Sequence, residues 1–272
     1  TPPWRRCRNR RHLPSQMTSR QPVLHSDFLT RRLAHRGFHD LAAGRPENSR
    51  AAFAAAIENG FGIELDLQLS RDGRAIVFHD YDLKRLTGQS GPIQQRTAFE
   101  LAQLPLLGND EPIPTLQEVL AFVDGRAPLL IEIKDQDGAM GAAVGKLERA
   151  AADDLANYSG PVALMSFNPH SVRQCSGLAP TIPRGIVTCG YTAEDWPMLP
   201  AGTRDRLREI PDYESTGSTF ISHEAEDLDN PRVADLKARG AHILCWTIRS
   251  AAQEKTARMV ADNVTFEGYT PR

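Results

Sequence analysis

Hydrophobic and polar residues alternate in two short runs that lie close together in the first third of the chain. The first run is Ile63-Glu64-Leu65-Asp66-Leu67-Gln68-Leu69, the second is Ala75-Ile76-Val77-Phe78-His79, and Asp72-Gly73 lies between them. A period of two is typical of strands, and a central Asp-Gly is typical of a β-hairpin because glycine tolerates the positive φ of a two-residue turn. With Asp72 and Gly73 as the two turn residues, Asp66 is predicted to pair directly with His79.

The predicted hairpin gathers ionisable side chains on one face. Glu64 lies two residues before Asp66 and therefore shares its face with Asp66 and His79. Two neighbouring carboxylates repel each other, and burial increases that repulsion. A divalent cation removes it, since carboxylate oxygens suit Mg²⁺ or Ca²⁺. The alternative is the solvated polar face of an amphipathic strand; the combination of Glu, Asp and His near the strand ends favours the metal site.

Strand and helix patterns alternate along the rest of the chain. Strands are expected at residues 33, 63, 129, 162, 184, 219, 242 and 264, and helices over 50–59, 116–123, 140–157, 170–177, 231–239 and 251–261. This order favours an α/β fold, a closed (β/α)8 TIM barrel, over an open doubly wound sheet, and no Gly-x-Gly-x-x-Gly follows the first strand. Residues 81–113 are expected to form a small insertion after the hairpin that follows strand 2, and residues 191–211 a second loose region.

The beginning of the chain differs in composition from the remainder. Residues 1–16 carry Arg5, Arg6, Arg8, Arg10 and Arg11 with three prolines and no amphipathic stripe. The segment lacks the apolar core of a secretory signal, so a basic tail, a transit-like leader and a cloning-derived sequence stay open. Residues 17–272 are expected to form a single barrel domain.

Composition narrows the function classes. The net charge of −2 gives no electrostatic indication of a nucleic-acid partner, and no apolar run is long enough for a membrane span. The cysteines (Cys7, Cys175, Cys189 and Cys245) are scattered without a Cys-x-x-Cys pair. This argues against a zinc site or a disulfide framework and favours a reducing, cytoplasmic compartment.

Polar residues gather where the predicted strands end, which is the face that carries the chemistry of a (β/α)8 barrel. Three of them, Glu64, Asp66 and Glu132, can hold one divalent ion. Two histidines can serve as acid and base, and two cations suit a phosphate; these residues are His35 and His79, and Arg36 and Lys134. His223 also follows a strand but is a weaker candidate for the pocket.

Structural roles compete with these assignments. Arg36 could form only an ion pair with Glu47, and Lys134 could serve only to neutralise Glu132. Trp246 is as compatible with a core position as with a wall of the pocket. Taken singly, each residue leaves both readings open.

The order of the motifs resembles that of the glycerophosphodiester phosphodiesterase family. The resemblance rests on His35-Arg36-Gly37, Pro46-Glu47-Asn48-Ser49, Glu64-Leu65-Asp66, Asp72-Gly73, His79-Asp80, Pro114-Thr115-Leu116, Glu132-Ile133-Lys134, Ser166-Phe167 and Trp246-Thr247. It implies a metal-dependent (β/α)8 barrel that hydrolyses small-molecule glycerophosphodiesters to sn-glycerol 3-phosphate and an alcohol. It further implies that Glu64, Asp66 and Glu132 bind Mg²⁺ or Ca²⁺, that His35 and His79 are the acid–base pair, and that Arg36 and Lys134 contact the phosphate; Glu47, Phe167 and Trp246 are pocket candidates.

Two segments depart from the family pattern. Ile248-Arg249 stands where the family usually has Asn after Trp-Thr, and Phe266-Glu267-Gly268-Tyr269-Thr270-Pro271 replaces a Thr-Asp-x-Pro-like run. Both are expected near the pocket rim, where they would bear on substrate choice.

Alternative functions are a lysophospholipase D or phosphoinositide-type phospholipase acting on lipid, and a non-catalytic barrel that binds phosphorylated ligands. The barrel shows no amphipathic or basic membrane-binding stretch, which argues against a lipid substrate. A binding protein needs no proton donor, so the pair of histidines argues against the second. The sequence leaves open the alcohol headgroup, the choice between Mg²⁺ and Ca²⁺, the histidine that acts first and the oligomeric state.

Overall fold

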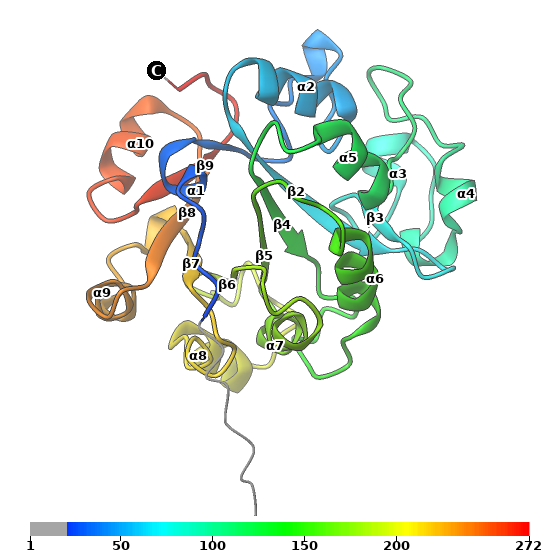
Figure 1. The fold of residues 1–272 in the computed structure, drawn as a ribbon. Helices are drawn as coiled ribbons and strands as arrows, with labels where there is room; N and C mark the ends of the chain where they lie inside the picture. The colour runs from blue at the N-terminus through cyan, green and yellow to red at the C-terminus, as the bar shows by residue number, and fades with distance from the viewer. Residues whose placement is uncertain (1–20, 272) are drawn as a thin grey trace, which may run out of the picture.

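A nine-stranded sheet closes on itself in the computed structural model, which describes residues 21–271 (Figure 1). All strands except β3 run parallel, in the order β1-β9-β8-β7-β6-β5-β4-β2, and pairing of β1 with β2 closes the ring. Their bounds are β1 Leu33–Ala34, β2 Gly62–Leu69, β3 Ala75–Val77, β4 Leu129–Ile133, β5 Val162–Ser166, β6 Arg184–Thr188, β7 Phe220–Glu224, β8 His242–Ile248 and β9 Asn263–Phe266. The predicted (β/α)8 barrel is confirmed.

Helices surround this ring on its outer side (Figure 1). They are α1 Asp27–Thr30, α2 Arg50–Glu58, α3 Lys84–Thr87, α4 Ala98–Leu101, α5 Leu116–Val123, α6 Lys146–Leu155, α7 Pro169–Leu178, α8 Ala201–Arg208, α9 Pro231–Ala238 and α10 Ala251–Ala257, with the 3₁₀ turns η1 Leu41–Ala43, η2 Ile93–Gln95 and η3 Ala225–Asp227. The bounds of α5 match the prediction because Thr115 and Glu118 form a capping box at its start. Helix α8 lies in the region expected to be loose, since Leu207 is its only buried residue and no apolar stripe indicates a helix.

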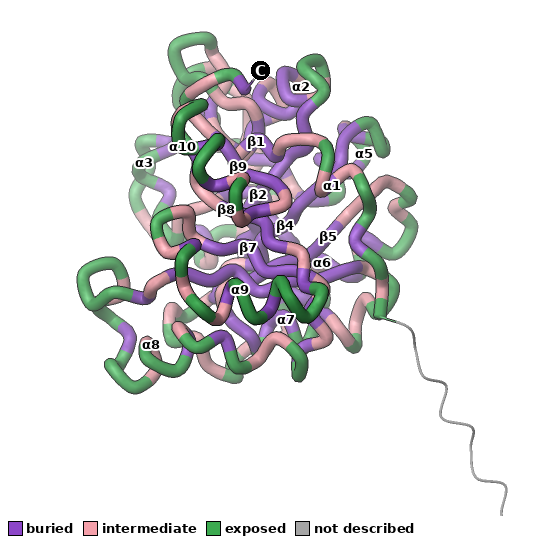
Figure 2. The backbone as a smooth tube through the Cα atoms, turned by 90° about the vertical axis from the view of Figure 1, so that its left-hand side faces the viewer, coloured by how far each residue is buried: buried purple, intermediate pink, exposed green. Residues whose placement is uncertain are grey.

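The barrel interior is apolar at one end and polar at the other. Leu33, Leu130 and Phe220 pack inside the ring together with Leu24 and Phe28, which precede β1. The strands lie at the buried centre of the molecule, and exposed residues gather on the outer helices and loops (Figure 2). Side chains alternate along each strand, so the residues two or four positions after these apolar ones point into the opposite end of the barrel.

A glycine makes the packing around Phe220 feasible. A Cβ atom at Gly185 would lie 2.4 Å from the Phe220 ring and 2.6 Å from its carbonyl oxygen. The Phe220 side chain is fully buried. The missing side chain at Gly185 therefore leaves space for an aromatic ring that fills the barrel.

The hairpin forms, but the predicted register is wrong by one residue. Leu67 pairs with Val77, and the backbone N–H of Phe78 donates to Asp66 O at 3.0 Å, so Phe78 rather than His79 lies level with Asp66. The loop contains three residues, because Gly73 adopts φ +80° after a turn closed by its N–H and Ser70 O at 3.0 Å. A left-handed glycine that follows such a turn is typical of three-residue hairpin loops.

The segment 81–113 folds against the outer side of the hairpin. It holds α3, η2 and α4, and its apolar residues form a cluster of their own with Ile76 and Phe78. Leu83 and Leu86 of this cluster are buried on either side of Lys84-Arg85. The segment is thus a small packed unit rather than a loose excursion.

The basic segment predicted at residues 1–16 lies outside the described residues. Within residues 21–271, no helix combines the length and the apolar character needed to cross a membrane.

The loop geometry yields a stability prediction. Gly73→Ala should lower the free energy of unfolding by about 1 kcal/mol, because an L side chain is strained at φ +80°. Gly177→Ala is the matched control: Gly177 lies in α7 with open space around its Cα, so alanine should raise the same free energy by up to about 1 kcal/mol. Chemical denaturation measures both, and equal effects of the two substitutions would contradict the assigned loop.

Candidate active site

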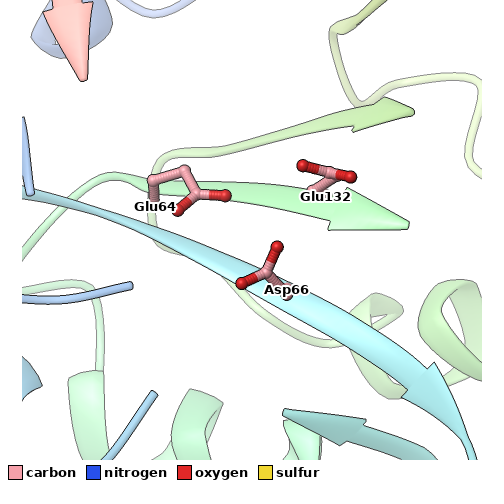
Figure 3. Close-up of side chains that lie close together, drawn as sticks. All are labelled: Glu64, Asp66 and Glu132. Carbon is pink, nitrogen blue, oxygen red and sulfur yellow. The ribbon is translucent and has the colours of Figure 1, made fainter. Parts of the chain in front are cut away.

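Three carboxylates meet inside the polar end of the barrel. Glu64 and Asp66 project from β2, Glu132 projects from β4 at the level of Asp66, and the carboxylates converge between the two strands (Figure 3). One oxygen from each lies within 4.8 Å of the other two, and all three side chains are buried. The alternation predicted for residues 63–69 thus brings Glu64 and Asp66 to one face.

Two cations border this cluster. Lys134 Nζ lies 2.8 Å from Asp66 Oδ1 and 2.7 Å from Glu132 Oε1, and Arg36 Nε lies 3.5 Å from Asp66 Oδ2. Burial opposes ionisation of Asp66, but the nearby positive charges outweigh it and hold the pKa of Asp66 well below its usual range. The pKa of Glu64 is raised instead, by burial and by repulsion from Asp66 and Glu132.

The cluster fits a hard divalent cation. Although Lys134 lies close, no donor among residues 21–271 meets Asp66 Oδ1 or Glu132 Oε1 with hydrogen-bond geometry, and both atoms are buried. A buried carboxylate oxygen without a hydrogen bond is costly in an apolar interior. An all-oxygen donor set of this kind is what Mg²⁺ and Ca²⁺ prefer.

A residue that the sequence analysis did not single out orients the cluster. Asn48 donates from Nδ2 to Asp66 Oδ2 at 3.0 Å and is buried. Its φ of +56° is a conformation that asparagine adopts more readily than most residues. The only signal for Asn48 in the sequence is its place in the run Pro46-Glu47-Asn48-Ser49, which is equally compatible with a residue that merely precedes a helix.

His35 follows β1 and faces the carboxylates with one ring nitrogen. Nε2 lies 4.0 Å from Glu64 Oε2, while Nδ1 lies 2.6 Å from Glu267 Oε2. Burial lowers the pKa of His35 and outweighs the hydrogen bond to Glu267, which raises it. The lowered pKa favours a neutral imidazole ring at neutral pH. Glu267 in turn lies 2.7 Å from Arg249. Glu267 was predicted only as a rim residue, so its contact with His35 is a finding of the structure.

His79 has a comparable partner on the other side of the site. Its Nδ1 lies 2.7 Å from Asp80 Oδ1. Because β3 ends at Val77, the chain turns after the strand and His79 reaches the pocket in spite of the shifted register. Both histidines therefore line one pocket together with Glu64 and Glu132.

The structure contains the ion pairs of Arg36 with Glu47 and of Lys134 with Glu132 that a purely structural role predicts. Arg36 Nη1 donates to Glu47 Oε1 at 2.8 Å, so Glu47 lies behind Arg36 and does not line the pocket. Arg36 and Lys134 nevertheless line it, so their ion pairs leave both available to a ligand.

The pocket has a volume of about 180 Å³ and one apolar wall. Phe167 and Trp246 form this wall with their rings edge to face at 5.5 Å, and Trp246 Nε1 donates to Ser222 O at 2.9 Å. The volume is below the range of about 300–1,000 Å³ typical of sites for drug-sized ligands, so the pocket suits a small one.

His223, the weaker candidate, does not line the pocket. It is fully buried, with Nδ1 2.7 Å from Thr188 Oγ1 and Nε2 3.1 Å from Asp227 Oδ2. The first contact joins β7 to the end of β6 and the second joins β7 to η3, which is a structural role.

Comparison with known proteins identifies the family. The model of the glycerophosphoryl diester phosphodiesterase family matches residues 35–265, from His35 to the last strand. The chain belongs to this family. The predicted resemblance is confirmed, and the chain is an enzyme of the phosphoric diester hydrolase class, a glycerophosphodiester phosphodiesterase.

Individual relatives cover most of the barrel. The Bacillus subtilis protein YhdW is 30% identical over 241 residues, which are 85% of this chain and 90% of that protein. A glycerophosphodiester phosphodiesterase of Caldanaerobacter subterraneus is 35% identical over 175 residues, or 61% of this chain and 70% of the relative. The structure of an Oleispira antarctica phosphodiesterase in complex with the product sn-glycerol-3-phosphate has a TM-score of 0.70 and 26% identity, and the match covers 87% of this chain and 92% of that one.

The contact between His35 and Glu267 yields a pH prediction. The hydrogen bond from His35 is the main cause that lowers the pKa of Glu267 below 4.5 in the folded enzyme. The unfolded chain therefore binds a proton at Glu267 first, and the stabilisation is present at neutral pH and lost as the pH falls below about 4.5. Wild type should be more stable than Glu267→Gln at pH 7, and the difference should shrink on acidification.

Denaturant unfolding from pH 7 to pH 3.5 measures this difference. Glu226→Gln is the matched control, because Glu226 is exposed on η3 and makes no hydrogen bond among the described residues. A difference between wild type and Glu267→Gln that stays constant down to pH 3.5 would contradict the predicted linkage.

Proposed function

We propose that this glycerophosphodiester phosphodiesterase releases sn-glycerol 3-phosphate and an alcohol by metal-dependent acid–base catalysis through His35 and His79. The observation that carries the proposal is that two imidazoles and two of the three clustered carboxylates line one small pocket. The complex of the Oleispira antarctica phosphodiesterase with sn-glycerol-3-phosphate supports this product.

Glu64, Asp66 and Glu132 would hold one divalent ion, Mg²⁺ or Ca²⁺. Bound there, it would supply Lewis acidity toward a phosphate oxygen and a nearby hydroxyl. The same carboxylates support this proposal: burial and repulsion from Asp66 and Glu132 raise the pKa of Glu64, and within residues 21–271 only two cations, Lys134 and Arg36, contact the three carboxylates.

The two histidines would move the protons. One imidazole accepts the proton of a glycerol hydroxyl as that oxygen attacks phosphorus, and the other donates a proton to the departing alcohol oxygen. A cyclic phosphate results, and water opens it with the two roles exchanged. Glu267 and Asp80 contact Nδ1 of His35 and of His79 respectively, which leaves each Nε2 to face the substrate.

Arg36 and Lys134 would offset the charge that grows on the phosphate oxygens. Lys134 Nζ lies 2.8 Å from Asp66 Oδ1 and 2.7 Å from Glu132 Oε1 and lines the pocket, so its charge lies next to the proposed phosphate position. Arg36 lines the same pocket while its Nη1 contacts Glu47, so its guanidinium charge also lies beside the proposed phosphate position.

The proposed mechanism predicts loss of activity on metal removal. EDTA should abolish release of glycerol 3-phosphate from glycerophosphocholine, and Mg²⁺ or Ca²⁺ should restore it. Calorimetry of the same ions should show binding to wild type and at least tenfold weaker binding to Glu132→Gln, because one of three ligands is lost. Activity that persists in EDTA would contradict the metal requirement, whereas metal binding without any release would shift the substrate to lysolipids or the function to binding.

The second prediction concerns the histidines. His35→Ala and His79→Ala should each lower kcat by about 10²–10⁴-fold, since each removes a proton-transfer group. His170→Ala is the control, because His170 is exposed on α7 and lies outside the pocket. Near-wild-type turnover by either variant would remove that histidine from the mechanism.

A further inference from the structure

Arg85 on α3 contacts two carboxylates at the mouth of the barrel. Its Nε and Nη2 donate to Asp80 Oδ2 and Oδ1 at 2.7 and 2.8 Å. Its Nη1 and Nη2 donate to Glu47 Oε2 and Oε1 at 2.7 and 2.8 Å. One planar guanidinium thus engages both carboxylates in a bidentate manner, which a lysine could not do.

Each of these carboxylates also holds a residue that lines the pocket. Asp80 Oδ1 contacts His79 Nδ1 at 2.7 Å, and Glu47 Oε1 accepts from Arg36 Nη1 at 2.8 Å. The oxygens that face the site are the same ones that accept from Arg85 Nη2. Arg85 therefore lies at the centre of a chain of contacts that runs from His79 through two carboxylates to Arg36.

We propose that Arg85 is a positioning residue that sets the orientation of His79 and of Arg36 together, from outside the pocket. The inference rests on the proposed roles of His79 and Arg36 and adds a single group on which both depend. Arg85 itself is absent from the residues that line the pocket, so it acts through Asp80 and Glu47.

The charges of the network favour this arrangement. Burial raises the pKa of Glu47, but hydrogen bonds from Arg85 and Arg36 outweigh it and lower that pKa. Burial is likewise outweighed at Asp80, where hydrogen bonds from His79 and Arg85 lower the pKa. Without Arg85, each carboxylate loses two hydrogen bonds, and each can then turn toward solvent and away from its partner in the site.

Packing fixes the position of Arg85. Leu83 and Leu86, which flank it, are buried in the apolar cluster of segment 81–113. The Arg85 side chain itself is 48% exposed, so solvent screens its ion pairs and limits their contribution to overall stability. Its removal should therefore change the geometry of the site more than the stability of the fold.

The test begins with Arg85→Gln. Its kcat should fall by about 10–100-fold, as is typical when a residue that orients a primary group is lost. Its KM should rise as well, because Arg36 loses its support. The midpoint of thermal unfolding should fall by no more than a few degrees. Arg71→Gln is the matched control: Arg71 also joins the hairpin to segment 81–113, through Glu100 at 3.1 Å, but it has no contact with the site.

Chemical rescue separates positioning from a general structural role. Arg85→Ala opens an accessible cavity between Asp80 and Glu47, and added guanidinium should restore at least tenfold of the lost rate, while methylammonium at equal concentration should not. Arg85→Lys should recover only part of the rate. The double variant Arg85→Gln/Asp80→Asn should lose less than the product of the two single losses, because both act on His79.

Three outcomes would overturn the proposal: wild-type kinetics of Arg85→Gln, an equal loss in Arg71→Gln, or equal rescue by both cations. Each of these outcomes is distinguishable from failure of the proposed function. If the proposed function fails, His35→Ala or His79→Ala retains activity. If only the Arg85 proposal fails, both histidine variants still lose turnover.

Discussion

The rest of the site depends on one electrostatic constraint, the burial of three carboxylates within 4.8 Å of one another. Such a cluster is unstable in a low-dielectric interior unless cations balance it. Lys134 and Arg36 supply two positive charges, and the opposite pKa shifts of Asp66 and Glu64 show how unevenly this compensation is distributed. The cations favour the ionised form of Asp66, while burial and the two neighbouring carboxylates disfavour ionisation of Glu64. A divalent ion among the three carboxylates would favour the ionised form of Glu64 as well.

The barrel makes this concentration of charge feasible. Leu33, Leu130 and Phe220 fill one end of the interior, and the period of two then places His35 and Glu132 at the other end of the same strands. The apolar layer supplies the stability that the polar layer reduces. Fold and site are therefore two ends of the same set of strands.

The sequence predicts the elements whose signals are local. The eight barrel strands and the bounds of α5 follow from alternation, from strand–helix order and from a capping box, all of which lie within a few residues of chain. The hairpin register was wrong, because Asp-Gly is compatible with two loop lengths and only the left-handed Gly73 together with Ser70 decides between them. Helix α8 was missed, since it buries a single side chain and therefore shows no apolar period.

Within the candidate site, too, the residues with local sequence signals were predicted and those without such signals were not. The carboxylates, the histidines and Lys134 lie in β2 and β4 or shortly after strands and are visible in the sequence. Two of their contacts, Asn48 and Glu267, come from loops that the closed barrel brings to them. Glu267 is the clearest case: it lies 232 positions from His35 in the chain yet contacts it at 2.6 Å. Glu267 belongs to the second departure from the family pattern and its partner Arg249 to the first, so the two unusual segments meet in one ion pair. Both segments were predicted to lie near the pocket rim and to influence substrate choice. In the structure, Glu267 contacts Nδ1 of His35, and of these two residues it is Arg249 that lines the pocket. The two departures therefore form one unit that links the rim of the pocket to His35.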